Sequence, residues 1–279
     1  VRSDLEGITT GVGFTPFTAA YYIMLLPYSI VTISIVTALL PHLSKLAIEK
    51  NIEEVRKQLI RTIKMVGVVT VPSGVALFFF GPIMTEALYF GISLEDSRYI
   101  GQVLSALSLG LVAFSINLIL IRGFNAFEDT RTQVISILII NIISVALSYL
   151  SLEFLESRYV TIGLGVAFSV SYIVGLFITL SLLKKHTGKL SFSTFVGQHI
   201  KLYMASILAM APFFALVYFL EWESVDSSLI VRILRLALIL ALSGVFYLFL
   251  AKLFRVAEIA TLAEFGRGLL KKRKGRLDP

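Results

Sequence analysis

Seven long stretches with few or no charged side chains constrain the fold of this chain more than any other feature. They cover residues 14–41, 65–85, 99–121, 132–152, 159–183, 202–220 and 229–251. An α-helix needs about 20 apolar residues to cross a bilayer, and it satisfies its backbone hydrogen bonds internally. Strands of a membrane barrel would be about 10 residues long with alternating polarity, a pattern that these stretches do not follow. We therefore predict an all-α polytopic membrane protein with about seven transmembrane helices.

Composition places the chain in the same class. Of its 279 residues, 57% are hydrophobic and 15% are charged, and the mean hydropathy is +0.87. A typical soluble domain has about 25% charged residues. The chain contains no cysteine, which excludes disulfide bonds and cysteine-ligated metal sites.

The net charge of +7 is distributed unevenly along the chain. If the N-terminus lies outside and the stretches alternate in direction, the inside segments hold 20 of the 25 Lys and Arg residues. The positive-inside rule then predicts an outside N-terminus and a cytoplasmic C-terminus. Basic residues placed beside a membrane also argue against nucleic acid as a partner. An odd number of spans that starts outside leads us to expect at least one further helix before residue 1.

The first apolar stretch, residues 14–41, has a proline near its middle. As a straight helix it would be about 42 Å long, which exceeds the roughly 30 Å of a hydrocarbon core. Pro27 lacks an N–H and its ring crowds the preceding turn, so we predict a bend there. Bent helices are typical of alternating-access carriers, and channels and receptors contain them too.

Two amphipathic segments are predicted to lie on the membrane surface. One covers residues 43–63, where apolar residues recur at helical spacing. The other belongs to the C-terminal tail, residues 255–279, which ends in a run of Lys and Arg and suits an anionic inner leaflet. The simpler alternative is that the tail only fixes the orientation of the protein.

A stripe of small residues predicts close helix packing. Gly163, Ala167, Ser171 and Gly175 are spaced by four residues, so on a helix they lie on one side and let a neighbour approach. We interpret this stripe as a packing surface rather than a substrate site.

The sequence contains no arrangement typical of an enzyme. His42, His186 and His199 are far apart and have no second histidine or carboxylate at metal-binding spacing. No nucleotide-binding loop or nucleophile motif is present. We predict a transporter rather than an enzyme, with neither metal nor cofactor. The first six apolar stretches carry no charged side chain, which argues against a proton relay within them.

Two arginines mark the outer end of the last apolar stretch. Arg232 and Arg235 are three residues apart, so they share one face of a helix. They can meet lipid headgroups or an anionic ligand. We favour an interfacial pair whose long side chains reach toward the headgroups.

Two motifs resemble the MurJ/MviN family of lipid II flippases, within the multidrug/oligosaccharidyl-lipid/polysaccharide exporter superfamily. Residues 22–27 (YIMLLP) and 37–44 (TALLPHLS) are similar to that family's LP…T-x-LLP-x-LS helix. Residues 122–132 (RGFNAFEDTRT) are similar to its R-x-F-Y-A-x-x-D-T-K-T-P loop. The order and separation of the motifs also agree, and the pair Arg232 and Arg235 is similar to a pattern at the start of the family's last helix. The resemblance covers most of the chain.

The resemblance implies a fold in which this chain supplies helices 8 to 14 of fourteen. Residues 1–183 would form part of the second lobe with five transmembrane helices, 184–254 two additional helices and 255–279 the cytoplasmic tail. The implied function is part of a flippase that moves lipid-linked peptidoglycan precursor (lipid II) across the bacterial cytoplasmic membrane by alternating access. The implied partners are lipid II or a related undecaprenyl-pyrophosphate glycolipid, membrane lipids, an N-terminal lobe of the same protein and cell-wall regulatory proteins.

The resemblance also points to candidate substrate-cavity residues on the first helix. Tyr21 and Tyr22, which precede Pro27, stand where well-known members carry Asp-Arg, and Leu25 stands where they carry an acidic residue. Tyrosine hydroxyls can donate hydrogen bonds to phosphate or sugar groups in place of those charges. Ordinary aromatic packing is the alternative role.

The loop motif supplies a second set of candidates. They are Arg122, Gly123, Phe124, Asp129, Thr130 and Arg131. Asp129-Thr130 is predicted to cap the helix that follows. Arg122 and Arg131 can pair with Asp129 or with phosphates of the inner leaflet, and we favour a structural capping role of this loop over substrate binding. Phe127 replaces a basic residue of the family pattern, and Gln133 replaces a proline.

Two other functions fit the same sequence. One is export of another polyprenyl-linked glycan by a member of the same superfamily. The other is a non-transporting membrane scaffold for cell-wall proteins. Because alternating access requires two lobes that move against each other, we expect residues 1–279 alone to insert in a membrane without flipping lipid II.

Overall fold

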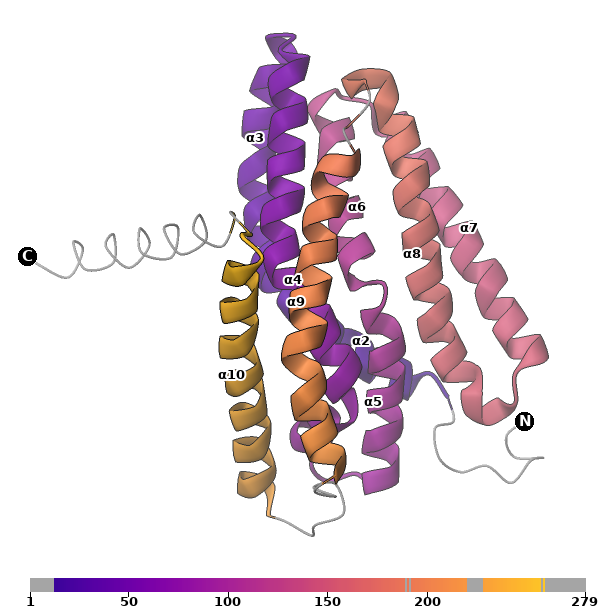
Figure 1. Cartoon of the computed structure of the whole chain (residues 1–279). Helices are drawn as coiled ribbons and strands as arrows, with labels where there is room; N and C mark the ends of the chain where they lie inside the picture. Colours follow the sequence, from indigo (N-terminus) through magenta and orange to yellow (C-terminus); the bar gives the residue numbers. More distant parts are fainter. Residues whose placement is uncertain (1–12, 189, 191, 220–227, 257, 259–279) are drawn as a thin grey trace, which may run out of the picture.

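The computed structural model describes residues 13–188, 190, 192–219, 228–256 and 258 of the chain. Its regular elements are helices (Figure 1). In chain order they are α2 (Thr15–Pro27), the π-helix η1 (Tyr28–Ile33), α3 (Ser34–Ile48), α4 (Ile52–Leu88), α5 (Leu94–Ser108), α6 (Leu111–Ala126), α7 (Thr130–Phe154), α8 (Ser157–Thr187), α9 (Phe192–Phe219) and α10 (Leu229–Leu253).

The helices account for the predicted membrane spans. Among the described residues, α4, α7, α8, α9 and α10 are each long and apolar enough to cross a membrane as single helices. Two further spans are broken: one bends by 49° between α2 and α3, and the other bends by 47° between α5 and α6. Counting each bent pair once gives seven spans. The predicted all-α polytopic fold is confirmed.

The basic segments gather at one end of the molecule. The α3–α4 turn, the α6–α7 loop, the end of α8 and the start of α9 lie together at the top of Figure 1, and α10 runs toward the same end. These are the segments that the distribution of Lys and Arg assigns to the cytoplasm. The helix directions are therefore consistent with the predicted alternation of the spans. The basic tail beyond residue 258 lies outside the described residues.

The central helix is α4, which packs against α3, α5, α6, α9 and α10. In its most apolar window 61% of the residues are buried, whereas the corresponding fraction for α7 is 11%. With 37 residues, α4 is about 55 Å long at about 1.5 Å per residue, so it extends well beyond a hydrocarbon core of about 30 Å.

The predicted surface helix over residues 43–63 is wrong. The chain turns at Lys50, which has a φ of 55°, and α4 begins at Ile52 after its N-cap Asn51. Segment 43–63 is therefore the tip of an antiparallel hairpin between α3 and α4. Its apolar residues are buried in the core: Leu43, Leu46, Val55, Leu59 and Ile63. Helical periodicity predicts one apolar face, but it does not say whether lipid or another helix covers that face.

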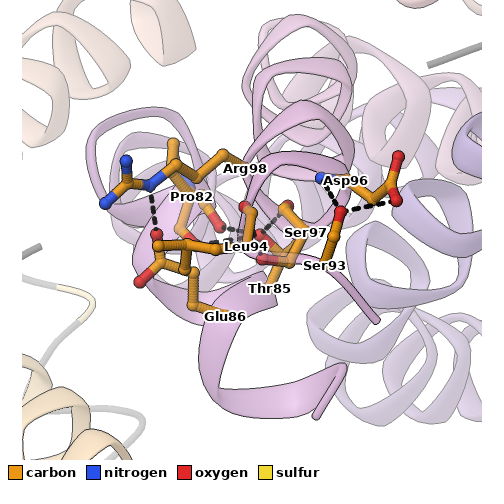
Figure 2. A network of polar contacts seen from close by, with 9 residues as sticks. Pro82, Thr85, Glu86, Ser93, Leu94, Asp96, Ser97 and Arg98 are labelled. Atoms are coloured by element: carbon orange, nitrogen blue, oxygen red, sulfur yellow. Dashed lines mark hydrogen bonds and ion pairs between the residues drawn. The ribbon is translucent and has the colours of Figure 1, made fainter. Parts of the chain in front are cut away.

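Polar contacts join α4 to α5 at the opposite end of the molecule (Figure 2). The Thr85 hydroxyl donates to the backbone oxygen of Ser97 at 2.7 Å. Arg98 Nε donates to Glu86 Oε1 at 2.7 Å, so the mostly buried carboxylate of Glu86 is paired. These contacts hold the α4–α5 corner with groups that the lipid interior would not satisfy.

Small residues on α8 allow close packing on two of its sides. The predicted stripe of Gly163, Ala167, Ser171 and Gly175 is buried. Its glycines face Ile140 and Ser151 of α7 and Leu155, which follows α7. This prediction is confirmed. A second small-residue side contacts α5 and α6. The predicted boundary at 183/184 falls inside α8, which continues to Thr187.

Candidate functional site

The first bent span breaks directly after the predicted proline. Pro27 is the last residue of α2, and the π-helical turn η1 connects it to α3. Hydroxyls of the same span bond to nearby carbonyls. Ser29 donates to Leu26, Ser34 to Ile30 and Thr37 to Ile33, at distances of 3.0, 2.7 and 2.8 Å. The missing N–H of proline and such back-bonding both favour a bend, so this break is built from local chemistry.

The break brings an aromatic cluster together from three parts of the chain. Its members are Tyr21 of α2, Tyr28 of η1, Phe114 of α6, and Phe168 and Tyr172 of α8. The Phe114 ring lies 4.5 Å from that of Tyr28 and 4.9 Å from that of Tyr172, centre to centre. Tyr21 joins through Phe168 at 5.8 Å. All five side chains are partly exposed.

The two predicted tyrosines point to different places. Tyr21 belongs to the aromatic cluster, whereas Tyr22 is 63% exposed. Consecutive residues on an α-helix are about 100° apart around its axis, so Tyr22 cannot contact the same neighbours as Tyr21. Tyr28 and Tyr172 complete the cluster and were missed by sequence reasoning. Their separation in sequence gave no signal, because only the packing of η1 and of α8 against α6 brings them together.

Tyrosines of the cluster differ from the structural tyrosines of the same chain. Tyr89, Tyr99 and Tyr247 each donate their hydroxyl to a backbone carbonyl of another segment, at 3.0, 2.7 and 2.8 Å. The hydroxyls of the three cluster tyrosines make no hydrogen bond to any other residue that the structure describes. They are therefore free to act as donors or acceptors toward a bound molecule.

Arg122 provides a positive charge within electrostatic range of Tyr28, one member of the aromatic cluster. It lies in the last turns of α6. Its Nε is buried and has no hydrogen-bond partner among the described residues. It does not pair with Asp129, one of the two alternatives that the sequence offered, and pairing with an inner-leaflet phosphate stays a prediction. A guanidinium within electrostatic range of a tyrosine hydroxyl supplies donors suited to phosphate.

The other residues of the loop motif have structural positions. Gly123 lies against the side chain of Leu183 in α8, and Phe124 is fully buried in the core. Thr130 is the first residue of α7. Arg131 is exposed and makes no ion pair with Asp129. Gly123 and Phe124 thus support the packing of α6 against α8 and the core.

Asp129 caps α7 as predicted, and its partner is a histidine. Its carboxylate accepts from the backbone N–H of Thr132 at 3.0 Å and contacts His186 Nε2 at 2.6 Å. The hydrogen bond with His186, followed by those with Thr132, holds the pKa of Asp129 well below its usual range. His186 also stacks on Phe127, with ring centres 5.0 Å apart. His186, at the end of α8, thus holds the α6–α7 loop through its contacts with Asp129 and Phe127.

The second bent span, α5–α6, breaks at Gly110 without a proline. A Cβ built on Gly110 would lie 2.7 Å from the Cα of Ser169 in α8, so only glycine fits this approach. Ser169 donates its hydroxyl to the backbone oxygen of Ala106 at 2.7 Å and lies 3.2 Å from that of Leu107. A side chain of another helix therefore satisfies carbonyls released at the break.

A buried chain of polar groups connects α7, α8 and α6 beside the same break. Ser136 and Thr179 share a hydrogen bond of 2.7 Å, and the Thr179 hydroxyl donates to Asn117 Oδ1 at 2.8 Å. Asn117 Nδ2 in turn donates to the backbone oxygen of Tyr172 at 3.1 Å. Isolated polar residues within apolar stretches are the signal that would have found these contacts.

The outer arginines lie at the start of α10. Arg232 and Arg235 are in its first two turns and are partly buried. The start of α10 and the end of α6 that carries Arg122 lie at opposite ends of the molecule (Figure 1). The two arginines therefore do not join the aromatic cluster. Among the described residues, no group of three or more His, Cys, Asp or Glu side chains is placed to hold a metal ion.

Comparison with known proteins gives consistent matches. The family described as "Lipid II flippase MurJ" matches residues 9–256. A "Probable lipid II flippase MurJ" of Rhizobium tropici is 30% identical over 157 residues, which is 56% of this chain and 29% of that protein. Another, of Borreliella burgdorferi, is 22% identical over 239 residues, which is 82% of this chain and 46% of that protein.

The fold also matches a solved structure. The structure described as "Lipid II flippase MurJ, inward closed conformation" superimposes with a TM-score of 0.63 at 22% identity. The match covers 86% of this chain and 46% of the other. The chain thus spans less than half the length of these two relatives and of this solved chain.

Proposed function

This chain belongs to the MurJ family of lipid II flippases, and on that premise we propose that it forms part of a transporter that moves lipid II across the cytoplasmic membrane. The family consists of transporters rather than enzymes, in agreement with the sequence. Because the chain spans less than half of its matched relatives, we propose that transport also requires the N-terminal lobe of an alternating-access carrier.

The observation that carries the proposal is the aromatic cluster, with the charge of Arg122 within electrostatic range of Tyr28. A lipid-linked glycan presents a pyrophosphate and sugar hydroxyls to its carrier. Arg122 supplies a cation for phosphate, and Tyr21, Tyr28 and Tyr172 supply unbonded hydroxyls. The rings of the cluster add apolar faces on which a sugar packs. We propose that this cluster lines the path of the headgroup, with Tyr22 outside it.

The aromatic cluster lies at the break of the first span, and this position supports a movement of one half of the span relative to the other. Carriers place bent helices around their substrate path, and the bend lets one half of the helix reorient. Pro27 and η1 adjoin Tyr28 directly. We propose that reorientation of α2 relative to α3 changes the side from which the cluster is reached.

We further propose that the basic end of the molecule faces the cytoplasm and that the α7–α8 turn faces outward. Single cysteines introduced at Lys45 and Lys185, which are exposed at the basic end, test this orientation. A membrane-impermeant thiol reagent added to intact cells should leave them unlabelled and should label a cysteine at Glu156. Labelling at all three positions at one rate would contradict the orientation.

Complementation tests the transport function. The reading frame that encodes this chain is expressed in cells depleted of their own flippase, and survival and lipid II in the outer leaflet are measured. We expect Arg122→Gln to reduce outer-leaflet lipid II about tenfold, since a charged hydrogen bond contributes roughly 1.5–3 kcal/mol. Arg131→Gln, from the same loop motif but exposed, is the matched control and should behave as wild type.

The other outcomes separate the alternatives. Survival without any change in outer-leaflet lipid II would indicate another polyprenyl-linked glycan. Equal effects of Arg122→Gln and Arg131→Gln at equal protein levels would remove Arg122 from the path. An additional arm that expresses residues 1–279 alone should show membrane insertion without rescue, and rescue in that arm would contradict the need for an N-terminal lobe.

A further inference from the structure

A second polar site lies at the basic end of the molecule, away from the aromatic cluster. It is a pocket of about 330 Å³ where α4, the start of α9 and the residues after α10 meet. Its polar lining consists of Lys64, Gln198, Lys201, Arg255 and Glu258. We propose that this basic pocket binds the phosphate headgroup of an anionic phospholipid.

The charges of the basic pocket do not balance. Lys64 Nζ lies 3.6 Å from Glu258 Oε1, and both side chains are largely shielded, with 23% and 18% of their surface exposed. Lys201 and Arg255 are exposed and make no ion pair with another residue that the structure describes. Two cations therefore remain available. Basic pockets between transmembrane helices at the cytoplasmic side are suited to anionic lipid headgroups.

The backbone holds these cations in place. Gln198 Nε2 donates to the backbone oxygen of Lys64 at 3.2 Å, which joins α9 to α4. Arg255 follows the end of α10 with a φ of 54°, a left-handed conformation that favours glycine. The next N–H, of Val256, bonds to Ala251 at 3.1 Å and closes the helix. An arginine at a glycine-type position is consistent with a role for its charge.

An apolar groove begins one helical turn from the basic pocket. Its volume is about 680 Å³, and its walls include Val68 and Pro72 of α4, Met210 of α9 and Tyr247 of α10. Val68 lies four residues after Lys64, so pocket and groove follow the same side of α4. A phospholipid places its phosphate next to its acyl chains, which matches this order. Free phosphate would occupy only the basic pocket and leave the apolar groove empty. We therefore propose a phospholipid, which fills both.

The test compares lipids on the purified protein. Native mass spectrometry counts retained phosphatidylglycerol or phosphatidylcholine, and thermal unfolding is followed with each lipid or with inorganic phosphate. We expect phosphatidylglycerol to be retained and to raise the melting temperature, while phosphatidylcholine and inorganic phosphate have little effect. Stabilisation by inorganic phosphate to the same extent would replace the lipid with a free anion and overturn the proposal.

Two variants at left-handed positions separate charge from folding. Arg255→Gly removes a pocket cation but suits its backbone, so the protein should fold while its affinity for phosphatidylglycerol falls about fivefold. Lys50→Gly is the matched control, because Lys50 has a φ of 55° at the same end and lies outside the pocket. Combining Arg255→Gly with Lys201→Gln should weaken binding about thirtyfold.

Removing the carboxylate of Glu258 should change the affinity for phosphatidylglycerol in the opposite direction, because it is an anion of the basic pocket. Glu258→Gln removes the one anion of the lining, so affinity for phosphatidylglycerol should rise severalfold. Equal lipid retention by Arg255→Gly and Lys50→Gly, or a loss of retention in Glu258→Gln, would overturn the proposal. Neither readout depends on lipid II transport, so its failure leaves the proposed flippase function untouched.

Discussion

The two bent spans have almost the same angle but opposite causes. The α2–α3 span bends by 49° and the α5–α6 span by 47°. In the first, Pro27 and hydroxyls of the span itself create and satisfy the break. In the second, Gly110 and the hydroxyl of Ser169 from α8 do so. A bend made by local chemistry can change its shape alone, whereas a bend held by a neighbouring helix moves only with that neighbour.

The difference suggests a division of roles between the spans. The first break lies at the aromatic cluster and carries Tyr28, whose hydroxyl is unbonded among the described residues. The second is enclosed by α8 and by the buried chain from Ser136 to Asn117. We therefore expect the second span to be part of a rigid frame and the first to be the adjustable part. Substitutions at and next to the two breaks test this comparison, ordered by the expected loss of stability.

The largest loss is expected at the second break, for Gly110→Ala. The added Cβ would meet the backbone of Ser169 at 2.7 Å, and a backbone atom cannot move aside without shifting α8. Overpacking of this kind costs about 1–3 kcal/mol of unfolding free energy, measurable by unfolding in SDS. Gly244→Ala is the control, because nothing lies within 4 Å of its Cβ and alanine favours the helix. Equal responses would mean that the break is not enclosed.

The next comparison concerns the N-caps that follow each bent span. Asn51 caps α4 with one hydrogen bond of 3.2 Å, so Asn51→Ala should cost about 0.5–1 kcal/mol. Asp129→Ala should lose at least twice as much stability, because it releases His186 of α8 as well as Thr132. If both caps are equivalent by SDS unfolding, α8 does not secure the end of the second span.

The same carboxylate predicts a dependence on pH. The pKa of Asp129 is lowered in the folded protein, first by His186 and then by Thr132. A lowered carboxyl pKa contributes stability above the unfolded value of about 3.9, and this contribution is lost as the pH falls. The difference in melting temperature between wild type and Asp129→Asn should therefore narrow below about pH 4. A constant difference from pH 3 to 7 would contradict the ionic role of Asp129.

A smaller effect is expected for the hydroxyls at the two breaks. Ser169→Ala leaves the carbonyls of Ala106 and Leu107 without their donor from α8, and such contacts contribute about 0.6 kcal/mol, at most about 1.7, within membranes. Ser29→Ala should change the unfolding free energy by less than about 0.5 kcal/mol, since this exposed hydroxyl bonds within its own helix. A larger effect for Ser29 would reverse the comparison.

Pro27→Ala is expected to change the stability of the protein least of all these substitutions. It should change the shape of the first span most. Alanine restores the missing N–H and suits a helix better than proline, so thermal stability should stay the same or rise slightly. Spin labels at the exposed positions Tyr22 and Lys45 should move apart as the span straightens, and transport by the complete protein should fall. An unchanged label distance with normal transport would leave the proline without a role in the bend.

Much of the fold and part of the site could be predicted because their causes are local. Spans follow from apolar length, the bend at Pro27 from a missing N–H, and the cap at Asp129 from a short polar side chain before a helix. The stripe from Gly163 to Gly175 also predicted packing. The hairpin at 43–63 could not be distinguished from a surface helix, because lipid and protein cover an apolar face equally well.

By itself, the sequence determined that this protein is helical, lies in a membrane with its basic segments at one end, and resembles lipid II flippases. The tertiary structure alone decided which tyrosines share the aromatic cluster, that Asp129 pairs with His186 rather than with Arg122, and that Ser169 closes the break at Gly110. These contacts join residues about 60 to 150 positions apart. Helix packing chooses them, and it depends on the shapes of whole helix faces, which no local pattern of residues encodes.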